Sequence, residues 1–249
     1  MEKIQALYKL YLKWGKVFTD SRLSSQGGLF FALKGERFDA NDFALQALAK
    51  GANCAVVDRA DLSQHKGCFY VENTLEALQQ LANYHRKQLS IPVLAITGSN
   101  GKTTSKELIT AVLKQKFNVL STQGNLNNHI GVPLTLLDIK PEHQIAVVEM
   151  GANHIGEIEF LCRIAQPDFG LITNVGKAHI EGFGSFEGVI KTKTEMYRYL
   201  AQNGGKGIFV NLSNKHLREL LPQGVDVLSY ASGSEKTDLA GEMVNNDRF

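Results

Sequence analysis

The most constraining feature of the sequence is a short apolar run, Val93 to Thr97, that leads directly into Gly98-Ser99-Asn100-Gly101-Lys102-Thr103-Thr104. This order predicts a buried strand, a glycine-containing loop and the first turn of a helix. Glycines let backbone N–H groups turn toward an anion, the helix N-terminus adds positive potential, Lys102 supplies a charge and Thr103 a hydroxyl for Mg²⁺. We therefore expect residues 98–104 to bind the phosphates of a nucleoside triphosphate.

The loop is a variant of the usual phosphate-binding pattern. Ile96 stands where that pattern has its first glycine, five residues before Gly101. A glycine-containing turn before a helix is often a plain connection that binds no ligand. The Gly-Lys-Thr order after a buried strand favours the nucleotide site over that alternative.

The composition excludes several classes of protein. With 249 residues, 43% of them apolar, the chain is long enough to form a large hydrophobic core, and we expect two separate cores. No apolar run approaches the roughly 20 residues that span a bilayer, and the first residues do not form a signal peptide, so we expect a cytoplasmic protein. The three cysteines, Cys54, Cys68 and Cys162, suit neither a disulfide framework nor a zinc site. A net charge of +2 does not favour nucleic-acid or membrane binding.

Residues 1–88 are predicted to form a small α/β domain, followed by a linker over residues 88–92. Its expected helices cover residues 1–18, 41–50 and 74–87, and its expected strands cover residues 29–33, 55–57 and 69–71. Loops beside the first strand carry Ser21, Arg22 and Lys34, which would suit a phosphate or a sugar. By themselves these residues are explained more simply as surface turns.

Residues 89–249 are predicted to form a second domain, because strands and helices alternate there as in a parallel sheet covered on both faces. The expected strands cover residues 93–97, 118–121, 145–150, 169–173 and 207–210, and the expected helices cover residues 103–116, 132–137, 155–165 and 186–202. Ligands of such sheets bind at the carboxyl ends of the strands. Glu149, Asn174 and His179 follow strands there.

Glu149 ends a buried apolar strand, where a carboxylate is costly to keep charged unless it meets a cation. A neighbouring strand to the phosphate loop offers Mg²⁺ as that cation. The alternative is that Glu149 caps the segment Gly151-Ala152-Asn153-His154. For His179 a metal ligand and a loop histidine bonded to backbone are equally compatible with its position.

Several motifs together resemble the Mur ligases of peptidoglycan synthesis. They are Thr97 to Thr104, Gly124-Asn125-Leu126-Asn127-Asn128, Gly131-Val132-Pro133-Leu134-Thr135, Glu149-Met150-Gly151, Thr173-Asn174-Val175-Gly176, Ala178-His179 and Lys193-Thr194-Glu195. Near the N-terminus, Asp20-Ser21-Arg22, Gly28-Leu29-Phe30 and residues 32–39 resemble the branch of this family that adds D-alanyl-D-alanine to UDP-N-acetylmuramoyl-tripeptide.

The resemblance implies an ATP-dependent amide ligase that phosphorylates the peptide carboxylate and lets an amine attack the acyl phosphate. It implies that Lys102 holds the β- and γ-phosphates, that Thr103 and Glu149 bind one Mg²⁺, and that His179 helps to bind a second. It also matches Lys193 to a lysine that CO₂ converts to a carbamate on the metal side of the site. Without the resemblance, Lys193 would be interpreted as a helix-surface lysine paired with Glu195.

The resemblance assigns Ser21, Arg22 and Lys34 to the UDP end of the substrate, and Asn127 and Asn128 to its sugar or peptide part. These two asparagines could instead cap the helix expected at residues 132–137, as asparagine commonly does. A monomer is expected.

The chain departs from the family in length, because these ligases carry a third, C-terminal domain for which the sequence has no counterpart. We therefore expect residues 89–249 to be an incomplete central domain. Two alternatives stay open: a fragment that only binds UDP-precursor and ATP, and another Mur ligase or a folate polyglutamate ligase. A guanine-nucleotide switch is disfavoured, because no Asn-Lys-x-Asp motif is present.

Overall fold

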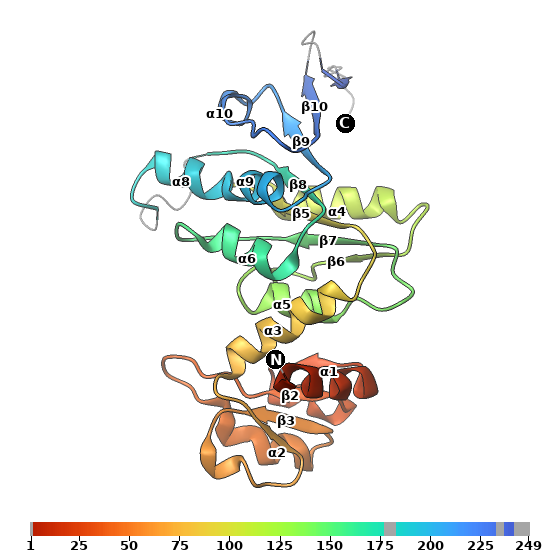
Figure 1. Ribbon diagram of the computed structural model, residues 1–249, viewed down its shortest axis with the longest axis vertical. Coiled ribbons are helices and arrows are strands. Elements are labelled where there is room, and N and C mark those ends of the chain that lie inside the picture. The colour runs from red at the N-terminus through yellow and green to blue at the C-terminus, as the bar shows by residue number, and fades with distance from the viewer. Residues whose placement is uncertain (1, 177–182, 233–236, 242–249) are drawn as a thin grey trace, which may run out of the picture. The chain divides into compact units, whose positions relative to one another are not determined.

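The computed structural model describes residues 2–176, 183–232 and 237–241, and the chain divides into two compact units (Figure 1). Unit 1 comprises Met1–Ser90 and His129–Lys140, and unit 2 comprises Ile91–Asn128 and Pro141–Phe249. A domain boundary at residue 88 stays a prediction. The structure adds that a later segment, residues 129–140, returns to the first unit.

Unit 1 contains a four-stranded parallel sheet in the order β1-β2-β3-β4. Its strands are β1 (Val17–Phe18), β2 (Leu29–Phe31), β3 (Cys54–Val57) and β4 (Cys68–Tyr70). Its helices are α1 (Glu2–Trp14), α2 (Ala44–Ala49), α3 (Thr74–Lys87) and α5 (Gly131–Leu137), with short 3-10 turns η1 (Ser21–Gln26), η2 (Ala40–Phe43) and η3 (Ala60–Leu62).

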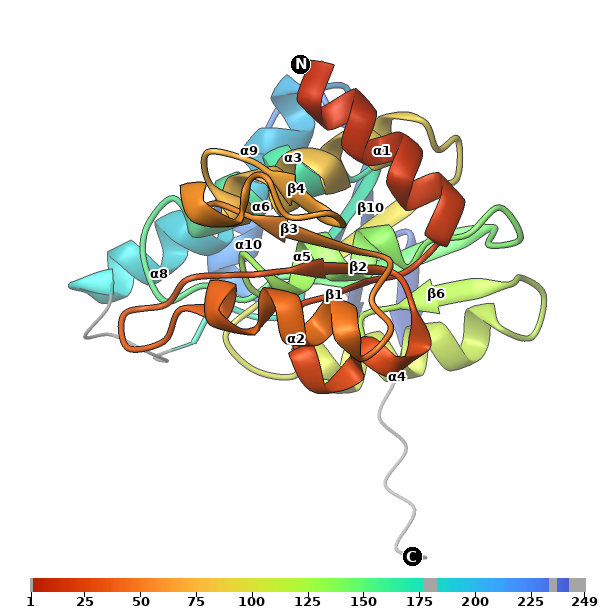
Figure 2. The ribbon, with the colours of Figure 1, turned by 90° about the horizontal axis from the view of Figure 1, so that it is seen from below.

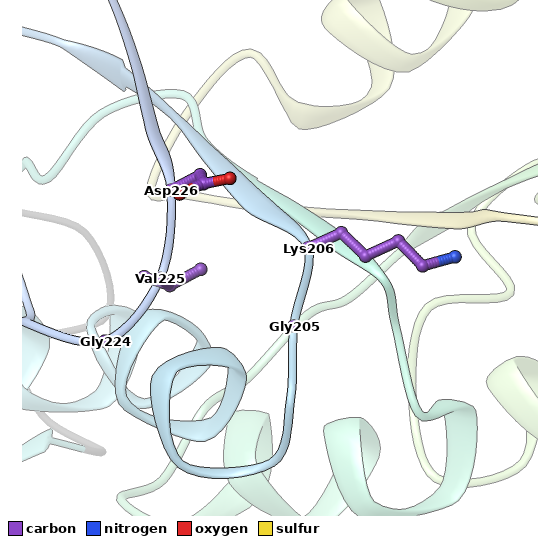
Figure 3. Close-up of a pocket in the computed structure, with 5 residues that line it drawn as sticks. All are labelled: Gly205, Lys206, Gly224, Val225 and Asp226. Carbon is purple, nitrogen blue, oxygen red and sulfur yellow. The ribbon is translucent and has the colours of Figure 1, made fainter.

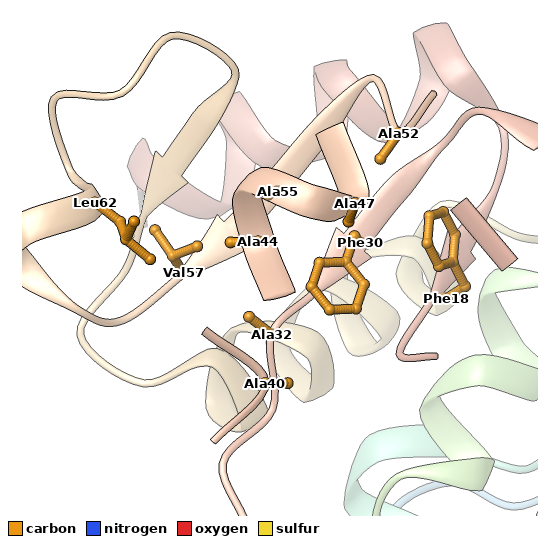
Figure 4. Close-up of a cluster of buried hydrophobic side chains, with 10 residues drawn as sticks. All are labelled: Phe18, Phe30, Ala32, Ala40, Ala44, Ala47, Ala52, Ala55, Val57 and Leu62. Carbon is orange, nitrogen blue, oxygen red and sulfur yellow. The ribbon is translucent and has the colours of Figure 1, made fainter. Parts of the chain in front are cut away.

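Helix α2 covers one face of this sheet, and α1 and α3 cover the other (Figures 1 and 2). Because both faces are covered, all three residues of β2 are buried. On the α2 side, Phe30 packs among small side chains such as Ala44, Ala47 and Ala55 (Figure 4). The alanines let the helix approach the strands closely, so this part of the core of unit 1 combines the rings of Phe18 and Phe30 with small side chains.

His85, near the end of α3, ties residues 129–140 to the rest of unit 1. Its Nε2 lies 3.1 Å from the carbonyl oxygen of Ile139, which can only accept, so Nε2 carries the hydrogen and Nδ1 can accept from the Tyr8 hydroxyl at 3.3 Å. Tyr11 donates to the carbonyl oxygen of Leu137 at 2.6 Å. Burial, reinforced by the charge of Lys140, lowers the pKa of His85.

Unit 2 contains a seven-stranded sheet, parallel throughout, in the order β11-β10-β9-β8-β5-β7-β6. Its strands are β5 (Val93–Thr97), β6 (Val119–Ser121), β7 (Ile145–Glu149), β8 (Phe169–Ile172), β9 (Gly207–Asn211), β10 (Val227–Ser232) and β11 (Leu239–Gly241). Its helices are α4 (Lys102–Leu113), α6 (Glu157–Ala165), α8 (Phe186–Lys193), α9 (Glu195–Gln202) and α10 (Lys215–Glu219).

After the central strand β5, the chain forms β6 and β7 on one side of β5 and then β8 and the later strands on its other side. Strand β7 pairs with one edge of β5 and β8 with the other, so the loop after β5 lies at the point where the strand order reverses. Ligands of open parallel sheets bind at such a point, outside the carboxyl ends of the strands. The topology therefore places the phosphate loop at the expected binding edge of the sheet.

The two faces of the second sheet are covered by different helices. Ile109 and Leu113 of α4 pack over Ile96 and Val147. On the other face, α9 lies so close to β8 that a Cβ at Gly170 would come within 2.5 Å of Leu200. Glycine at this position therefore lets α9 contact the strand.

The predicted α/β class and parallel sheets are confirmed, with corrections at element ends. The first helix ends at Trp14, not residue 18, because Gly15 adopts a left-handed conformation with φ 68° and its N–H closes the helix on the carbonyl of Tyr11. The helix expected at residues 186–202 is two helices that meet at Thr194, whose hydroxyl donates to the carbonyl of Ile190 at 2.8 Å. Strands β1, β10 and β11 were not anticipated.

No helix within the described ranges combines the length and the apolar character needed to cross a membrane.

The lowered pKa of His85 predicts a pH-dependent stability. Since the unfolded histidine has a pKa near 6.5, the unfolded chain binds more protons than the folded one just below that pH. The stabilisation is therefore complete above pH 6.5 and decreases as the pH falls from 6.5 through the lower folded-state pKa. We expect the thermal midpoint of unit 1 to fall between pH 7.5 and pH 5.5, and part of this fall to disappear in His85→Gln.

His65→Gln is the matched control, since His65 is exposed in the same unit. Its midpoint should follow the unsubstituted protein across the pH range. A His85→Gln variant with the same pH slope as the control would show that His85 does not titrate on unfolding.

Candidate functional site: a phosphate-binding loop beside a buried glutamate

The phosphate loop connects β5 to α4 through backbone conformations that two glycines permit. Gly98 has φ 146°, and a Cβ there would come within 2.0 Å of the Thr173 hydroxyl oxygen. Gly101 has φ 76° and occupies the N-cap of α4 without a side chain to block the first helical N–H groups. The loop therefore presents the amino end of a twelve-residue helix, as anion binding requires.

The end of β8 holds the loop in this shape. The backbone N–H groups of Ser99 and Asn100 donate to the carbonyl and side-chain oxygens of Asn174, at 3.0 and 3.1 Å. In return, Thr173 Oγ1 and Asn174 Nδ2 donate to the carbonyl of Asn100, at 2.6 and 2.9 Å. Asn174, noted in the sequence only as a strand-end residue, thus supports the loop. Such fixed geometry lowers the ordering cost of binding a ligand.

Lys102 folds back over the loop. Its ammonium donates to the carbonyl of Gly98 at 2.8 Å and contacts that of Ser99 at 3.2 Å. Burial lowers the pKa of Lys102, while the nearby Glu149 carboxylate opposes this shift. An incoming phosphate would offer the same ammonium stronger, charged acceptors in place of the two carbonyls.

Glu149 is 1% exposed at the carboxyl end of β7 and is held from three sides. Its Oε2 accepts from the Thr103 hydroxyl at 3.0 Å, its Oε1 accepts from Asn127 Nδ2 at 2.8 Å, and its N–H donates to the Thr122 hydroxyl at 2.9 Å. The structure thus brings together Thr103 and Glu149, which were predicted as ligands of the same ion.

Glu149 does not cap the segment that follows it. At the start of α6, Gly156 N–H and Glu159 N–H instead donate to the two carboxylate oxygens of Glu195, at 2.8 and 3.0 Å. Residues 153 and 154 bond to Glu157. The cap alternative for Glu149 is therefore wrong.

The donor set around Glu149 fits Mg²⁺. Among the described residues its carboxylate accepts hydrogen bonds from neutral donors, and the adjacent Thr103 hydroxyl, on the first turn of α4, could serve as a second oxygen ligand. Within the described ranges no three His, Cys, Asp or Glu residues form a metal cluster. Mg²⁺ commonly uses one or two carboxylates and takes its other ligands from phosphates and water. His179, the predicted ligand of a second ion, lies outside the described residues.

Lys193 is buried, with 3% of its surface exposed at the end of α8. Burial and the positive charge of Lys102 lower its pKa to about 8, against the weaker opposing effect of Glu195 and Glu157. About a tenth of the amine is then neutral at pH 7. The surface-lysine alternative is wrong, because the lysine is buried and Glu195 caps α6.

The remaining predicted residues fall into two groups. The side-chain amide of Asn127 bonds to Glu149, and Asn128 is exposed; whether either residue caps α5, whose N-cap residue is Ile130, stays a prediction. In unit 1, Arg22 is exposed and paired with Asp20 at 2.6 Å, which holds the pKa of Asp20 at about 2. Lys34 is also exposed, and Ser21 begins η1.

Thr122 and Lys106 belong to the surroundings of Glu149 but were missed in the sequence. Thr122 accepts the Glu149 N–H, and the Lys106 ammonium donates to the Thr122 carbonyl at 2.6 Å. Neither belongs to a recognised motif. The only available sequence signal was that Lys106 follows Lys102 by four residues and so shares its side of the helix.

A separate depression lies at the opposite edge of this sheet, before β9 and β10 (Figure 3). Gly205, Lys206, Gly224, Val225 and Asp226 line it. Since the strands are parallel, this amino-terminal edge is remote from the loop after β5. The depression is therefore no part of the phosphate site.

Two family descriptions match the chain. Residues 96–249 match the Mur ligase middle domain, and residues 16–86 match the Mur ligase family catalytic domain. The first match contains the phosphate loop, Glu149 and Lys193.

Several known proteins are similar to this chain at substantial identity. The chain is 49% identical over 191 residues to the UDP-N-acetylmuramoyl-tripeptide–D-alanyl-D-alanine ligase of Escherichia coli, covering 76% of this chain and 41% of that protein. A crystal structure of MurF from Acinetobacter baumannii superposes with a TM-score of 0.82 at 37% identity, over 96% of this chain and 53% of that one. The crystal structure of MurF ligase from Thermotoga maritima in complex with ADP superposes with a TM-score of 0.77 at 34% identity, over 87% of this chain and 50% of that one. The chain thus spans about half the length of these relatives.

The electrostatic interaction between Lys102 and Lys193 predicts how removing the charge of Lys102 changes the pKa of Lys193. Because the charge of Lys102 helps to lower the pKa of Lys193, Lys102→Met should raise the pKa of Lys193 above about 8. ¹⁵N NMR of the lysine side-chain nitrogens across pH 6 to 11 measures this pKa.

Lys191→Met is the control, because Lys191 lies exposed on the same helix as Lys193. That variant should leave the Lys193 titration in place. If the pKa of Lys193 were also unchanged in Lys102→Met, burial alone would set it.

Proposed function

The chain belongs to the Mur ligase family, and from this premise we propose that it carries the nucleotide and UDP-precursor sites of an ATP-dependent amide ligase. The reaction proposed is the addition of D-alanyl-D-alanine to UDP-N-acetylmuramoyl-tripeptide, the activity in the name of the Escherichia coli relative. The observation that supports it most is the joining of the phosphate loop to Glu149 through Thr103. A site of this kind suits phosphoryl transfer, which depends on positioning and charge neutralisation.

In the proposed reaction, an oxygen of the peptide carboxylate attacks the γ-phosphorus of ATP. The bond from that phosphorus to the β–γ bridging oxygen breaks, so ADP leaves and an acyl phosphate forms. The amine of D-alanyl-D-alanine then attacks the acyl carbon, loses a proton and expels phosphate. Both reactants of the first step are anions, so the site must offset their repulsion.

The residues of this chain meet that requirement from two directions. The N–H groups at the amino end of α4 and Lys102 would bind the phosphates, and Thr103 and Glu149 would hold Mg²⁺ against them. When bound, the ion neutralises charge on the phosphate oxygens. Because β8 already fixes the loop through Asn174, little reorganisation is needed when the nucleotide enters.

Lys193 is proposed to react with CO₂. Its neutral amine attacks the carbon, and loss of a proton leaves an N-carboxylate, a carbamate. With a pKa of about 8, Lys193 has an appreciable neutral fraction near physiological pH, whereas an ordinary lysine with a pKa near 10.5 is almost fully protonated. The new anion would replace a positive charge near Lys102 with a negative one, on the side where cations are held.

Other assignments rest on the family alone. We propose Ser21, Arg22 and Lys34 for the UDP end, Asn127 and Asn128 for the sugar or peptide part, and His179 for a second Mg²⁺. A cytoplasmic monomer is likewise proposed. Arg22 would have to exchange its contact with Asp20 for a ligand phosphate, which is feasible because the pair is exposed.

Lys102→Ala tests the nucleotide site. Because the ammonium would contact only phosphates, the variant should bind ATP with Mg²⁺ at least about tenfold more weakly, the loss of one charge-assisted hydrogen bond, while binding of the UDP-precursor is unchanged. Calorimetric titration of the chain with each ligand measures both affinities.

Lys114→Ala provides the control for this titration, since Lys114 is exposed at the far end of the same helix. Equal ATP affinities for the two variants would contradict the phosphate site. Parallel measurement of released phosphate with both ligands present separates a reacting site from one that only binds.

The carbamate has its own test. In ¹³C-labelled bicarbonate near pH 8, the chain should show one ¹³C carbamate resonance that is absent from Lys193→Arg, because a guanidinium stays charged and does not react. Lys191→Arg should keep the resonance. In phosphoryl-transfer assays, small carboxylates should partly restore Lys193→Ala, since they return an anion to the emptied space. A resonance that persists in Lys193→Arg would place the modification elsewhere.

A further inference from the structure

Lys106 is a fully buried lysine with no part in the reaction proposed above. It lies one turn after Lys102 on α4, with 0% of its surface exposed. Its ammonium donates to the Thr122 carbonyl at 2.6 Å and lies 3.0 Å from Glu107 Oε1, whose side chain is 64% exposed. Burying an ammonium is costly, and an aliphatic side chain would fill the same space at lower cost. The contact with Thr122 is therefore the feature to explain.

Thr122 joins three elements at the end of the edge strand β6. Its N–H donates to the Val147 carbonyl at 3.0 Å, which extends the pairing with β7 by one residue. Its hydroxyl accepts the N–H of Glu149 at 2.9 Å. Its carbonyl accepts from Lys106 of α4. With 1% of Thr122 exposed, water does not compete for these bonds, so each geometry constrains the others.

The hydrogen bond to the Glu149 side chain comes from the segment that begins at Thr122. Five residues after Thr122, Asn127 donates its side-chain amide to Glu149 Oε1 at 2.8 Å. The carbonyl of Asn127 accepts from Gly151 N–H at 2.7 Å, where a Cβ on Gly151 would come within 2.9 Å of the Asn127 side chain. Both the backbone and one carboxylate oxygen of Glu149 are thus held by a segment whose first residue is fixed by Lys106.

We propose that Lys106 is a positioning residue for the Mg²⁺ ligand Glu149, acting through Thr122. Being fully buried, Lys106 does not touch a bound nucleotide. It fixes the first residue of the segment 122–127, and this segment orients the Glu149 carboxylate toward Thr103. The inference rests on the proposed function, because it takes Glu149 as a metal ligand. Partners of metal ligands commonly change metal affinity by about 10- to 100-fold when removed.

The test measures how much Mg²⁺ the chain needs to bind a non-hydrolysable ATP analogue. Calorimetric titrations at a series of Mg²⁺ concentrations give the half-saturating Mg²⁺ concentration. Lys106→Met keeps the length of the side chain but removes the ammonium, so it should raise this concentration about tenfold. The affinity for the analogue at saturating Mg²⁺ should return to within about twofold of the unsubstituted protein, because no nucleotide contact is lost.

Two further variants separate positioning from general stability. Thr122→Val removes the hydroxyl that accepts from Glu149 and should raise the half-saturating Mg²⁺ concentration, whereas Thr122→Ser keeps the hydroxyl and should restore it. Glu107→Gln removes the exposed partner of Lys106 and should change it by less than about twofold. Because an unfolded fraction also weakens apparent binding, each variant is titrated at a temperature at which circular dichroism shows it to be folded.

The outcomes distinguish this inference from the proposed function. If Glu149→Gln leaves the Mg²⁺ midpoint unchanged, the metal site itself is wrong. If Glu149→Gln shifts it but folded Lys106→Met and Thr122→Val do not, the positioning role is overturned while the site stands. Should Lys106→Met fail to fold, the Thr122→Val and Thr122→Ser pair decides, and equal midpoints for the two overturn the inference.

Discussion

The Glu149 carboxylate is buried in unit 2, and within the described ranges its hydrogen-bond partners are neutral side chains. The carboxylate of Glu149 accepts bonds from the Thr103 hydroxyl and from the Asn127 side-chain amide, and the backbone N–H of Glu149 donates to the Thr122 hydroxyl. Neutral donors compensate only part of the cost of removing a carboxylate from water. A strand end built in this way is prepared for a cation, and α4, β6 and β7 are joined around it.

Two positively charged side chains, Lys102 and Lys193, interact unfavourably beside the phosphate loop. Lys102 and Lys193 are close enough that the first lowers the pKa of the second. Two cations that interact in this way favour ligands of opposite sign, as the phosphates proposed at Lys102 and the carbamate proposed at Lys193 would be. The two carboxylate oxygens of Glu195 accept N–H groups at the N-terminus of α6, and the negative charge of Glu195 opposes the lowering of the Lys193 pKa only weakly.

Much of the architecture could be predicted because it depends on local pattern. Apolar runs marked strands β5, β7 and β8, whereas the end of the first helix at Gly15 was missed although glycine is a common helix terminator. Less could be predicted where packing overrides pattern. The return of residues 129–140 to unit 1 depends on His85 and Tyr11 meeting two distant carbonyls, and sequence spacing does not encode that meeting. The break at Thr194 and strands β10 and β11 were missed for similar reasons.

The sequence by itself determined the glycine-containing loop after β5, the parallel α/β class and the family, because each has a local signature in residue type and order, and it singled out Glu149 by its place at a strand end, whereas Lys193 was indicated only by the family resemblance. Only the tertiary structure decided how these residues work together. It buried Lys193 and so lowered its pKa, closed Glu149 onto Thr103 and Asn127, and set Lys106 and Thr122 behind them. The physical reason is that desolvation and hydrogen-bond geometry depend on neighbours brought together across the sheet, and these are absent from any local stretch of chain.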